Sequence, residues 1–188
     1  HLTDQSGALQ GLETALEAFK LLVSSDPGET GRLAQQLHMR NQKRRELTLQ
    51  TQNQAAELAL SSGQSPWVMF ACSDEFNEGV IGLAASRLVD RYYRPAVVGA
   101  IKGDIARFSC RSIPELHITQ VLDDIGDLFI RHGGHAAAAG LSIQTDRIGE
   151  FQAKIESLVA SKLVGLDLCP VITIDQDASG EAITRFEG

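Results

Sequence analysis

Residues 95–110 read Pro-Ala-Val-Val-Gly-Ala-Ile-Lys-Gly-Asp-Ile-Ala-Arg-Phe-Ser-Cys, which is two short apolar runs around a Lys-Gly-Asp turn. This arrangement is typical of a β-hairpin, with strands predicted over 95–101 and 105–110. The apolar spacing on either side predicts further strands over 67–72, 137–143 and 171–174, and helices over 79–92, 118–131 and 146–163. Strands that alternate with helices are typical of an α/β fold, so we expect helices packed on a mixed sheet.

A long helix is predicted before this compact region, over residues 27–61. Asp26 is a good N-cap, Pro27 suits the first helical position, and Glu29 follows three residues after the cap. At 1.5 Å per residue this helix would be about 50 Å long. Its middle is polar on every side, which favours a helix that spans solvent between domains. A coiled coil is the alternative, but its apolar seam would be interrupted.

The chain is therefore expected to hold a long connector helix followed by a compact mixed-sheet domain. A shorter amphipathic helix is predicted before the connector, over residues 9–23. The predicted divisions are the end of a preceding domain or a helical lead-in at 1–26, the connector at 27–62, the compact domain at 63–165, and the start of a following domain or a tail at 166–188.

Composition and charge exclude several classes of protein. Of the 188 residues, 43% are apolar and 22% are charged, which predicts a folded chain. The sequence has no signal peptide, no membrane-length apolar run and no cysteine pairing pattern, so we expect a cytoplasmic protein without a disulfide framework or a zinc site. The net charge of −7 argues against coating of nucleic acid through bulk charge. Basic residues nevertheless gather in 31–45 and 87–111, either as solvated helix faces or as a local surface for anions.

Patterns that would carry catalysis are missing from this sequence. None of the five histidines stands in a metal-binding spacing, and the chain has no Asp-His-His run, nucleophile elbow or phosphate-binding loop. Asp123, Asp124 and Asp127 are interpreted as a solvated acidic face. The loop over 73–79 carries three carboxylates that would repel a phosphate, and Asn77 in it is interpreted as a helix N-cap. We therefore predict neither a catalytic residue nor a metal ligand in this chain.

Polar residues alternate along the strand predicted at 105–110. Alternation places Arg107, Ser109 and Arg111 on one face and the apolar Phe108 and Cys110 on the other. Guanidinium forks next to hydroxyls on a rigid strand suit the binding of phosphate. The alternative is an outer sheet face with scattered polar residues, and the spacing leaves both interpretations open.

A Gly133-Gly134-His135 sequence follows the helix predicted at 118–131. Two glycines let a backbone approach a ligand closely, and the histidine can donate to a phosphate or a sugar. The alternative is that the glycines cap the end of the preceding helix and the histidine has no role.

Three segments together resemble one family. They are Glu-Gly-Val-Ile-Gly-Leu-Ala-Ala-Ser-Arg at 78–87, Ser-Cys-Arg-Ser-Ile-Pro at 109–114, and Gly-Gly-His-Ala-Ala-Ala-Ala-Gly at 133–140. Their order and spacing resemble the second, DHHA1 domain of RecJ-type single-strand-specific DNA exonucleases, over about residues 21–175. The resemblance implies a 5′-to-3′ exonuclease of the DHH phosphoesterase superfamily that uses manganese or magnesium. The metal ligands of that family lie in its first, DHH domain, so this chain would supply substrate binding opposite the metal site.

The resemblance also implies site residues. Ser109, Arg111 and Ser112 match the Ser-x-Arg-Ser signature, and Gly133, Gly134 and His135 match the Gly-Gly-His signature, so both groups would hold phosphates of single-stranded DNA. Arg107 and Arg131 are added as neighbouring cations, and His135 is a candidate for supporting the chemistry. Protein partners in repair or replication are not identified by these residues.

Several positions depart from the family pattern. Phe76 and Asn77 replace Trp-His, Glu115 and His117 replace Gly and Asp and are expected to weaken a helix N-cap, and His132 replaces an aromatic residue. Two alternative functions remain open at this point. One is a phosphodiesterase of the same superfamily for cyclic dinucleotides or very short RNA, and the other is a non-catalytic module that binds nucleic acid or a protein partner.

Overall fold

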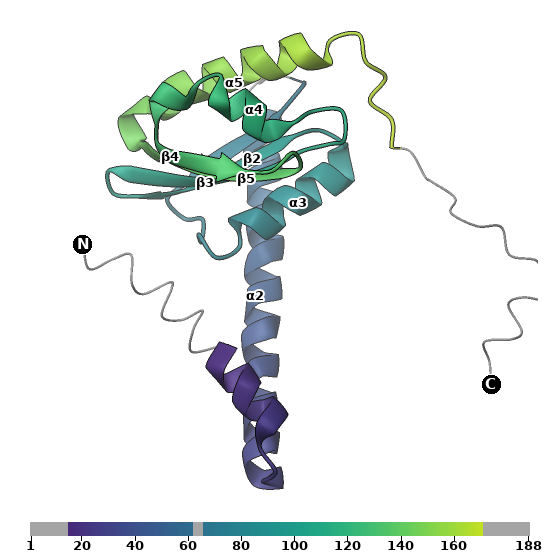
Figure 1. Ribbon diagram of the computed structural model, residues 1–188, viewed down its shortest axis with the longest axis vertical. Helices are drawn as coiled ribbons and strands as arrows, with labels where there is room; N and C mark the ends of the chain where they lie inside the picture. The colour runs from purple at the N-terminus through teal and green to yellow at the C-terminus, as the bar shows by residue number, and fades with distance from the viewer. Residues whose placement is uncertain (1–14, 62–65, 171–188) are drawn as a thin grey trace, which may run out of the picture.

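The structure is a computed structural model that describes residues 15–61 and 66–170 (Figure 1). A helical segment at residues 15–23 precedes the long helix α2 (Pro27–Ser61). The compact domain then contains β1 (Met69–Ser73), α3 (Ile81–Tyr92), β2 (Ala96–Lys102), β3 (Ile105–Arg111), α4 (Ile118–Asp123), the short 3-10 helix η1 (Gly126–Leu128), β4 (Phe129–Gly134), β5 (Ala138–Gln144), a second 3-10 turn η2 (Thr145–Arg147) and α5 (Ile148–Leu163). The predicted α/β class is confirmed.

The five strands form one mixed sheet in the order β1-β2-β3-β5-β4. β1 runs parallel to β2, and the other neighbours are antiparallel. The hairpin predicted around Lys102-Gly103-Asp104 joins β2 to β3, and Gly103 adopts the left-handed conformation (φ 60°) that this tight turn requires. The hairpin therefore contributes two inner strands of the sheet, and its turn sets the register between β2 and β3.

Helices cover the two faces of the sheet with different cores. On one face α4 and α5 pack over an aromatic cluster in which the Phe151 ring lies 5.2–5.6 Å from those of Phe70, Phe108 and Phe129. On the other face α3 and the last turns of α2 pack through small residues such as Ala55, Ala59 and Ala85. Small side chains let these two helices approach the strands closely, so this layer is thin and the basic face of β3 lies directly beneath α3.

The long helix was predicted with its bounds correct. Pro27 begins it and the Asp26 carboxylate accepts a hydrogen bond from the Gly28 N–H at 3.0 Å. Arg40, Lys43, Arg44 and Arg45 are exposed in its polar middle, and α2 projects away from the sheet in Figure 1. Arg40 forms an ion pair of 2.9 Å with Glu17 of the preceding helical segment, so the two helices contact each other. The connector role and the predicted domain limits remain predictions.

The helix predicted over 118–131 is wrong in its second half. α4 ends at Asp123, and residues 129–134 form the edge strand β4. Helical apolar spacing continues locally through Ile125 and Phe129, but β4 pairs with β5 and the Phe129 ring packs edge-on against Phe151 at 5.2 Å. Pairing with β5, which begins at Ala138, and packing against Phe151 override the local helical period here, and Gly126 within the predicted helix disfavours it further.

Smaller differences concern helix starts and the ends of the chain. α3 begins at Ile81 after a turn in which Asn77 accepts from the Gly79 N–H at 2.8 Å, so Asn77 caps that turn and not the helix. His117 does cap α4, because its Nδ1 accepts from the Gln120 N–H at 3.4 Å, so the expected weak cap is still made. The strand predicted at 171–174 and the first part of the helix predicted at 9–23 lie outside the described residues.

Candidate functional site

The alternation predicted along β3 is confirmed. Phe108 and Cys110 are buried against α5, while Arg107, Ser109 and Arg111 are partly exposed on the opposite face. The register places Arg107 beside Ser142, Ser109 beside Gly140 and Arg111 beside Ala138 on β5. On β4, Arg131 and Gly133 pair with the same Ser142 and Gly140. Sequence segments some thirty residues apart thus contribute to one continuous polar face.

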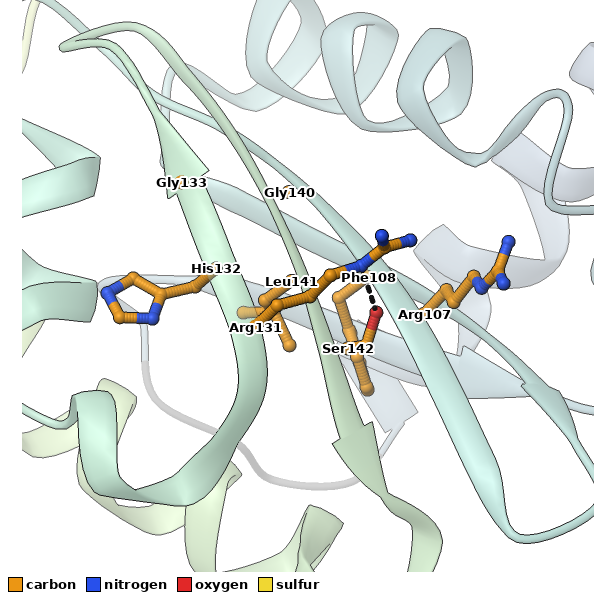
Figure 2. Close-up of a pocket in the computed structure, with 8 residues that line it drawn as sticks. All are labelled: Arg107, Phe108, Arg131, His132, Gly133, Gly140, Leu141 and Ser142. Carbon is orange, nitrogen blue, oxygen red and sulfur yellow. Dashed lines mark hydrogen bonds between the residues drawn. The ribbon is translucent and has the colours of Figure 1, made fainter. Parts of the chain in front are cut away.

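A shallow hollow of about 360 Å³ lies across this face, where β3, β5 and β4 run side by side (Figure 2). Its floor is main chain, because a Cβ at Gly133 would meet no atom within 4 Å and one at Gly140 would meet only the Phe108 carbonyl oxygen at 3.7 Å. A flat floor without side chains admits close approach of a ligand to the sheet.

Two arginines stand beside this floor. Figure 2 shows Arg107 and Arg131 extending to the same side of the strands, with the Arg131 Nε donating to the Ser142 Oγ at 3.4 Å. The Arg107 Nη1 lies 3.1 Å from the Glu78 Oε2, and about a third of each of these side chains is exposed. An ion pair this exposed is weak, so a phosphate can compete with Glu78 for the Arg107 guanidinium.

Arg111 lies beneath α3, and its side chain is held by residues of its own strand, β3. Its Nη1 donates to the Ser109 Oγ at 2.9 Å and to the Cys110 carbonyl oxygen at 2.8 Å. Ser112 is engaged differently, since its hydroxyl donates to the Leu116 carbonyl oxygen at 2.7 Å and its N–H to the Ala137 carbonyl oxygen. Ser109 thus orients the arginine, and Ser112 closes the loop after β3.

The Gly-Gly-His sequence ends a strand, so the interpretation of the glycines as a helix C-cap is wrong. A Cβ at Gly134 would overlap the Ala138 carbonyl oxygen, so only glycine fits there, whereas Gly133 is open. His135 is exposed, and its main chain makes two hydrogen bonds. Its backbone N–H donates to the Ala138 carbonyl oxygen at 2.8 Å, and its carbonyl oxygen accepts from the Thr119 hydroxyl at 2.7 Å. Since Ala138 also pairs with Arg111, the register brings His135 and Arg111 to the same end of the sheet.

His132 points away from the hollow in Figure 2. Its Nε2 lies 2.9 Å from the Asp123 Oδ1, and its ring packs against Phe129. Asp124 pairs with Lys162 of α5 at 3.4 Å, so these carboxylates tie α4 to its neighbours. Phe76 is only 1% exposed and belongs to the core under α3, which excludes it as a stacking platform for bases.

The described part of the chain contains neither a cluster of metal ligands nor a reactive thiol among Cys72 and Cys110. Within residues 15–61 and 66–170, no three His, Cys, Asp or Glu side chains converge to hold a metal ion. Burial raises the pKa of the Cys110 thiol to about 12 and also raises the pKa of Cys72. Both thiols are therefore protonated near neutral pH and are poor nucleophiles. No helix in the same residues is long and apolar enough to cross a membrane.

Three residues of this face escaped the sequence analysis. Ser142 anchors Arg131, Gly140 forms half of the floor, and Glu78 pairs with Arg107. Gly140 and Glu78 lie within the family-like segments but had no role assigned to them. Ser142 could be found only from the register between β5 and its two neighbours.

Comparison with known proteins adds a consistent set of relatives. Residues 64–161 match the family model of the DHHA1 domain. The chain is 30% identical to the single-stranded-DNA-specific exonuclease RecJ of Bacillus subtilis, over 97% of this chain and 24% of that protein. It is 34% identical to the RecJ exonuclease of Escherichia coli, over 76% of this chain and 26% of that protein. The chain thus spans about a quarter of these relatives' length.

Solved structures agree with this comparison. The crystal structure of RecJ from Thermus thermophilus in complex with Mn²⁺ superposes with a TM-score of 0.70 at 27% identity, covering 80% of this chain and 22% of that one. A second crystal structure, of exonuclease RecJ bound to manganese, gives a TM-score of 0.68 at 26% identity, covering 82% of this chain and 39% of that one.

Proposed function

The chain belongs to the DHHA1 domain family and is homologous to the C-terminal portion of RecJ exonucleases, and on that premise we propose that its basic sheet face holds single-stranded DNA for such an enzyme. The whole protein that contains this chain would hydrolyse phosphodiester bonds in the cytoplasm. Its DHH domain would supply the metal site. Neither of the two alternative functions is favoured, because the relatives named above are RecJ exonucleases.

One observation carries the proposal, namely that Arg107 and Arg131 stand beside the bare floor of Gly133 and Gly140. A guanidinium fork binds phosphate oxygens in a bidentate manner and reads no base, which suits an enzyme that moves along any sequence. The glycine floor leaves room for the sugar-phosphate backbone to lie against the sheet. Arg111 and His135, at one end of the same sheet, would hold a neighbouring phosphate, and Ser109 would keep Arg111 in place.

The residues described do not fit a catalytic metal ion, so we derive no hydrolytic step from them. The RecJ structures named above were solved with Mn²⁺ bound. In such an enzyme the metal stabilises the charge that develops on the phosphate under attack. The role of this chain would be to hold the strand so that each bond reaches that site in turn, which is positioning and not bond cleavage.

The test is the affinity of the whole protein for labelled oligothymidine, measured by fluorescence anisotropy in EDTA across a range of salt. We expect Arg107→Ala and Arg131→Ala each to weaken binding roughly tenfold or more. Each should also lower the slope of log affinity against log salt by about 0.7, because one fewer condensed cation is released per lost phosphate contact.

Arg87→Ala is the matched control, since Arg87 is exposed on α3 and does not line the hollow, so its loss removes the same charge without changing the lining. It should leave affinity nearly unchanged. Equal losses in all three variants would mean that bulk charge, and not this face, attracts the strand, and the proposal would be wrong.

A further inference from the structure

Gly82, the second residue of α3, lies directly over the Arg111 side chain. A Cβ built at Gly82 would lie 3.0 Å from the Arg111 Nη2 and 3.1 Å from the Ser109 Oγ. The first turn of α3 therefore forms a lid over the same two side chains that bond to each other on β3. Gly82 had no role assigned in the sequence analysis.

The guanidinium of Arg111 is fixed from two directions. The strand holds Nη1 through the Ser109 hydroxyl and the Cys110 carbonyl oxygen, at 2.9 and 2.8 Å. From above, the bare Cα of Gly82 leaves just enough room for Nη2. A long arginine side chain loses considerable rotamer freedom when it binds a phosphate, and this confinement removes part of that cost before the ligand arrives.

We infer that Gly82 is a positioning residue, whose missing side chain lets α3 hold the Arg111 guanidinium in the orientation that binds a phosphate of the strand. This inference rests on the proposed function. It identifies a determinant of strand affinity on α3 that touches no ligand itself and acts only through Arg111.

A methyl group at position 82 would displace side chains and leave the backbone in place. The atoms that it would meet are the far end of a flexible arginine and a serine hydroxyl, and neither is backbone. The guanidinium can therefore swing aside without moving the helix. Alanine is also a better helix former than glycine, so the folded state should be no less stable. The structure thus separates loss of binding from loss of folding at this residue.

A purely structural role for Gly82 makes a different prediction. If the glycine served only to let α3 pack closely on β3, then Gly82→Ala would push the helix off the sheet and lower the melting temperature. Binding would fall only in proportion to unfolding, whether or not Arg111 were present. The positioning role instead predicts an unchanged melting temperature and a loss of binding that occurs only when Arg111 is present.

The experiment compares Gly82→Ala, Arg111→Ala and the double variant in the whole protein that contains this chain. Gly149→Ala is the control, because Gly149 is likewise the second residue of its helix and its Cβ would meet nothing within 4 Å. Binding to labelled oligothymidine in EDTA and the melting temperature are measured for each. We expect Gly82→Ala to lose about threefold to tenfold in affinity with no fall in melting temperature, Gly149→Ala to lose nothing, and the double variant to bind like Arg111→Ala alone.

If Arg111→Ala binds normally, the role proposed for Arg111 in strand binding fails, and the inference about Gly82 fails with it. If Arg111→Ala is weakened while Gly82→Ala binds normally, only the inference is overturned. A lower melting temperature in Gly82→Ala but not in Gly149→Ala, or losses that add in the double variant, would also overturn it and assign Gly82 to packing.

Discussion

Two adjacent glycines at the end of β4 have opposite surroundings. The position of a Cβ on Gly133 is open, whereas one on Gly134 would overlap main-chain atoms of Ala138 and Ala139. The overlap is with backbone that pairs in the sheet, so it cannot be relieved by a side chain turning away. The second glycine is therefore required by the fold, and the first is available for a ligand.

Alanine substitutions should separate these two roles. We expect Gly134→Ala to lower the free energy of unfolding by about 2–4 kcal/mol, because the edge strand must shift away from β5. Gly133→Ala should change it by less than about 1 kcal/mol, since alanine is tolerated in an open strand position. Urea unfolding followed by circular dichroism measures both values. Equal destabilisation by the two substitutions would contradict the described geometry of β4.

Among the elements, those fixed by local chemistry were predicted most accurately. The bounds of α2 follow from its Asp26-Pro27 start and its unbroken run of helix formers, and the structure places both ends as predicted. The hairpin of β2 and β3 was likewise predictable, because its turn sequence and the alternation of polar and apolar residues along β3 are local features. Alternation along β3 also predicted which face carries Arg107 and Arg111, so part of the candidate site was visible in the sequence.

Elements fixed by tertiary contacts were not predictable in this way. β4 carries helical apolar spacing and becomes a strand only because β5 and Phe151 lie beside it. The same limit applies to the site, since the Arg131–Ser142 bond, the Glu78–Arg107 pair and the position of Gly82 above Arg111 all depend on register or packing. Local apolar spacing carries no signal for the register of one strand against another, or for which helix packs on which strand.

At the scale of the whole molecule, the two faces of the sheet differ in chemistry: one is apolar and buried, and the other is the basic face proposed to bind the strand. The face under α5 holds the aromatic cluster and the fully buried Cys110, and the opposite face carries the arginines. The thiol contributes to stability in a way that depends on pH. Burial raises its pKa in the folded state from 9.0 to about 12, so the folded protein keeps a proton that the unfolded chain releases above pH 9.

Alkaline solution should therefore destabilise the fold through this group. The contribution is fully present below pH 9 and is lost as pH rises toward 12, by up to about 1.4 kcal/mol per pH unit. Urea unfolding between pH 8 and pH 11 measures the slope. Cys110→Ala should be less stable at neutral pH because of the cavity but should lose less stability on going to pH 11. Parallel curves for the two proteins would show that Cys110 does not titrate as its burial predicts.

The absence of a metal-binding cluster in residues 15–61 and 66–170 leads to a prediction about the chain on its own. Hydrolysis of a phosphodiester at a useful rate needs an activated nucleophile and stabilisation of the developing charge, and the described residues hold no metal-binding cluster that would supply both. We therefore expect residues 1–188 with Mn²⁺ to leave a 5′-labelled single strand intact on a denaturing gel, while the whole protein degrades it under the same conditions. The chain should still bind that strand weakly and with strong dependence on salt, because the phosphate contacts proposed for Arg107 and Arg131 require no metal. Degradation that copurifies with the chain, stops in EDTA and is lost in Arg107→Ala would place the chemistry on this domain and refute its assignment to the DHH domain.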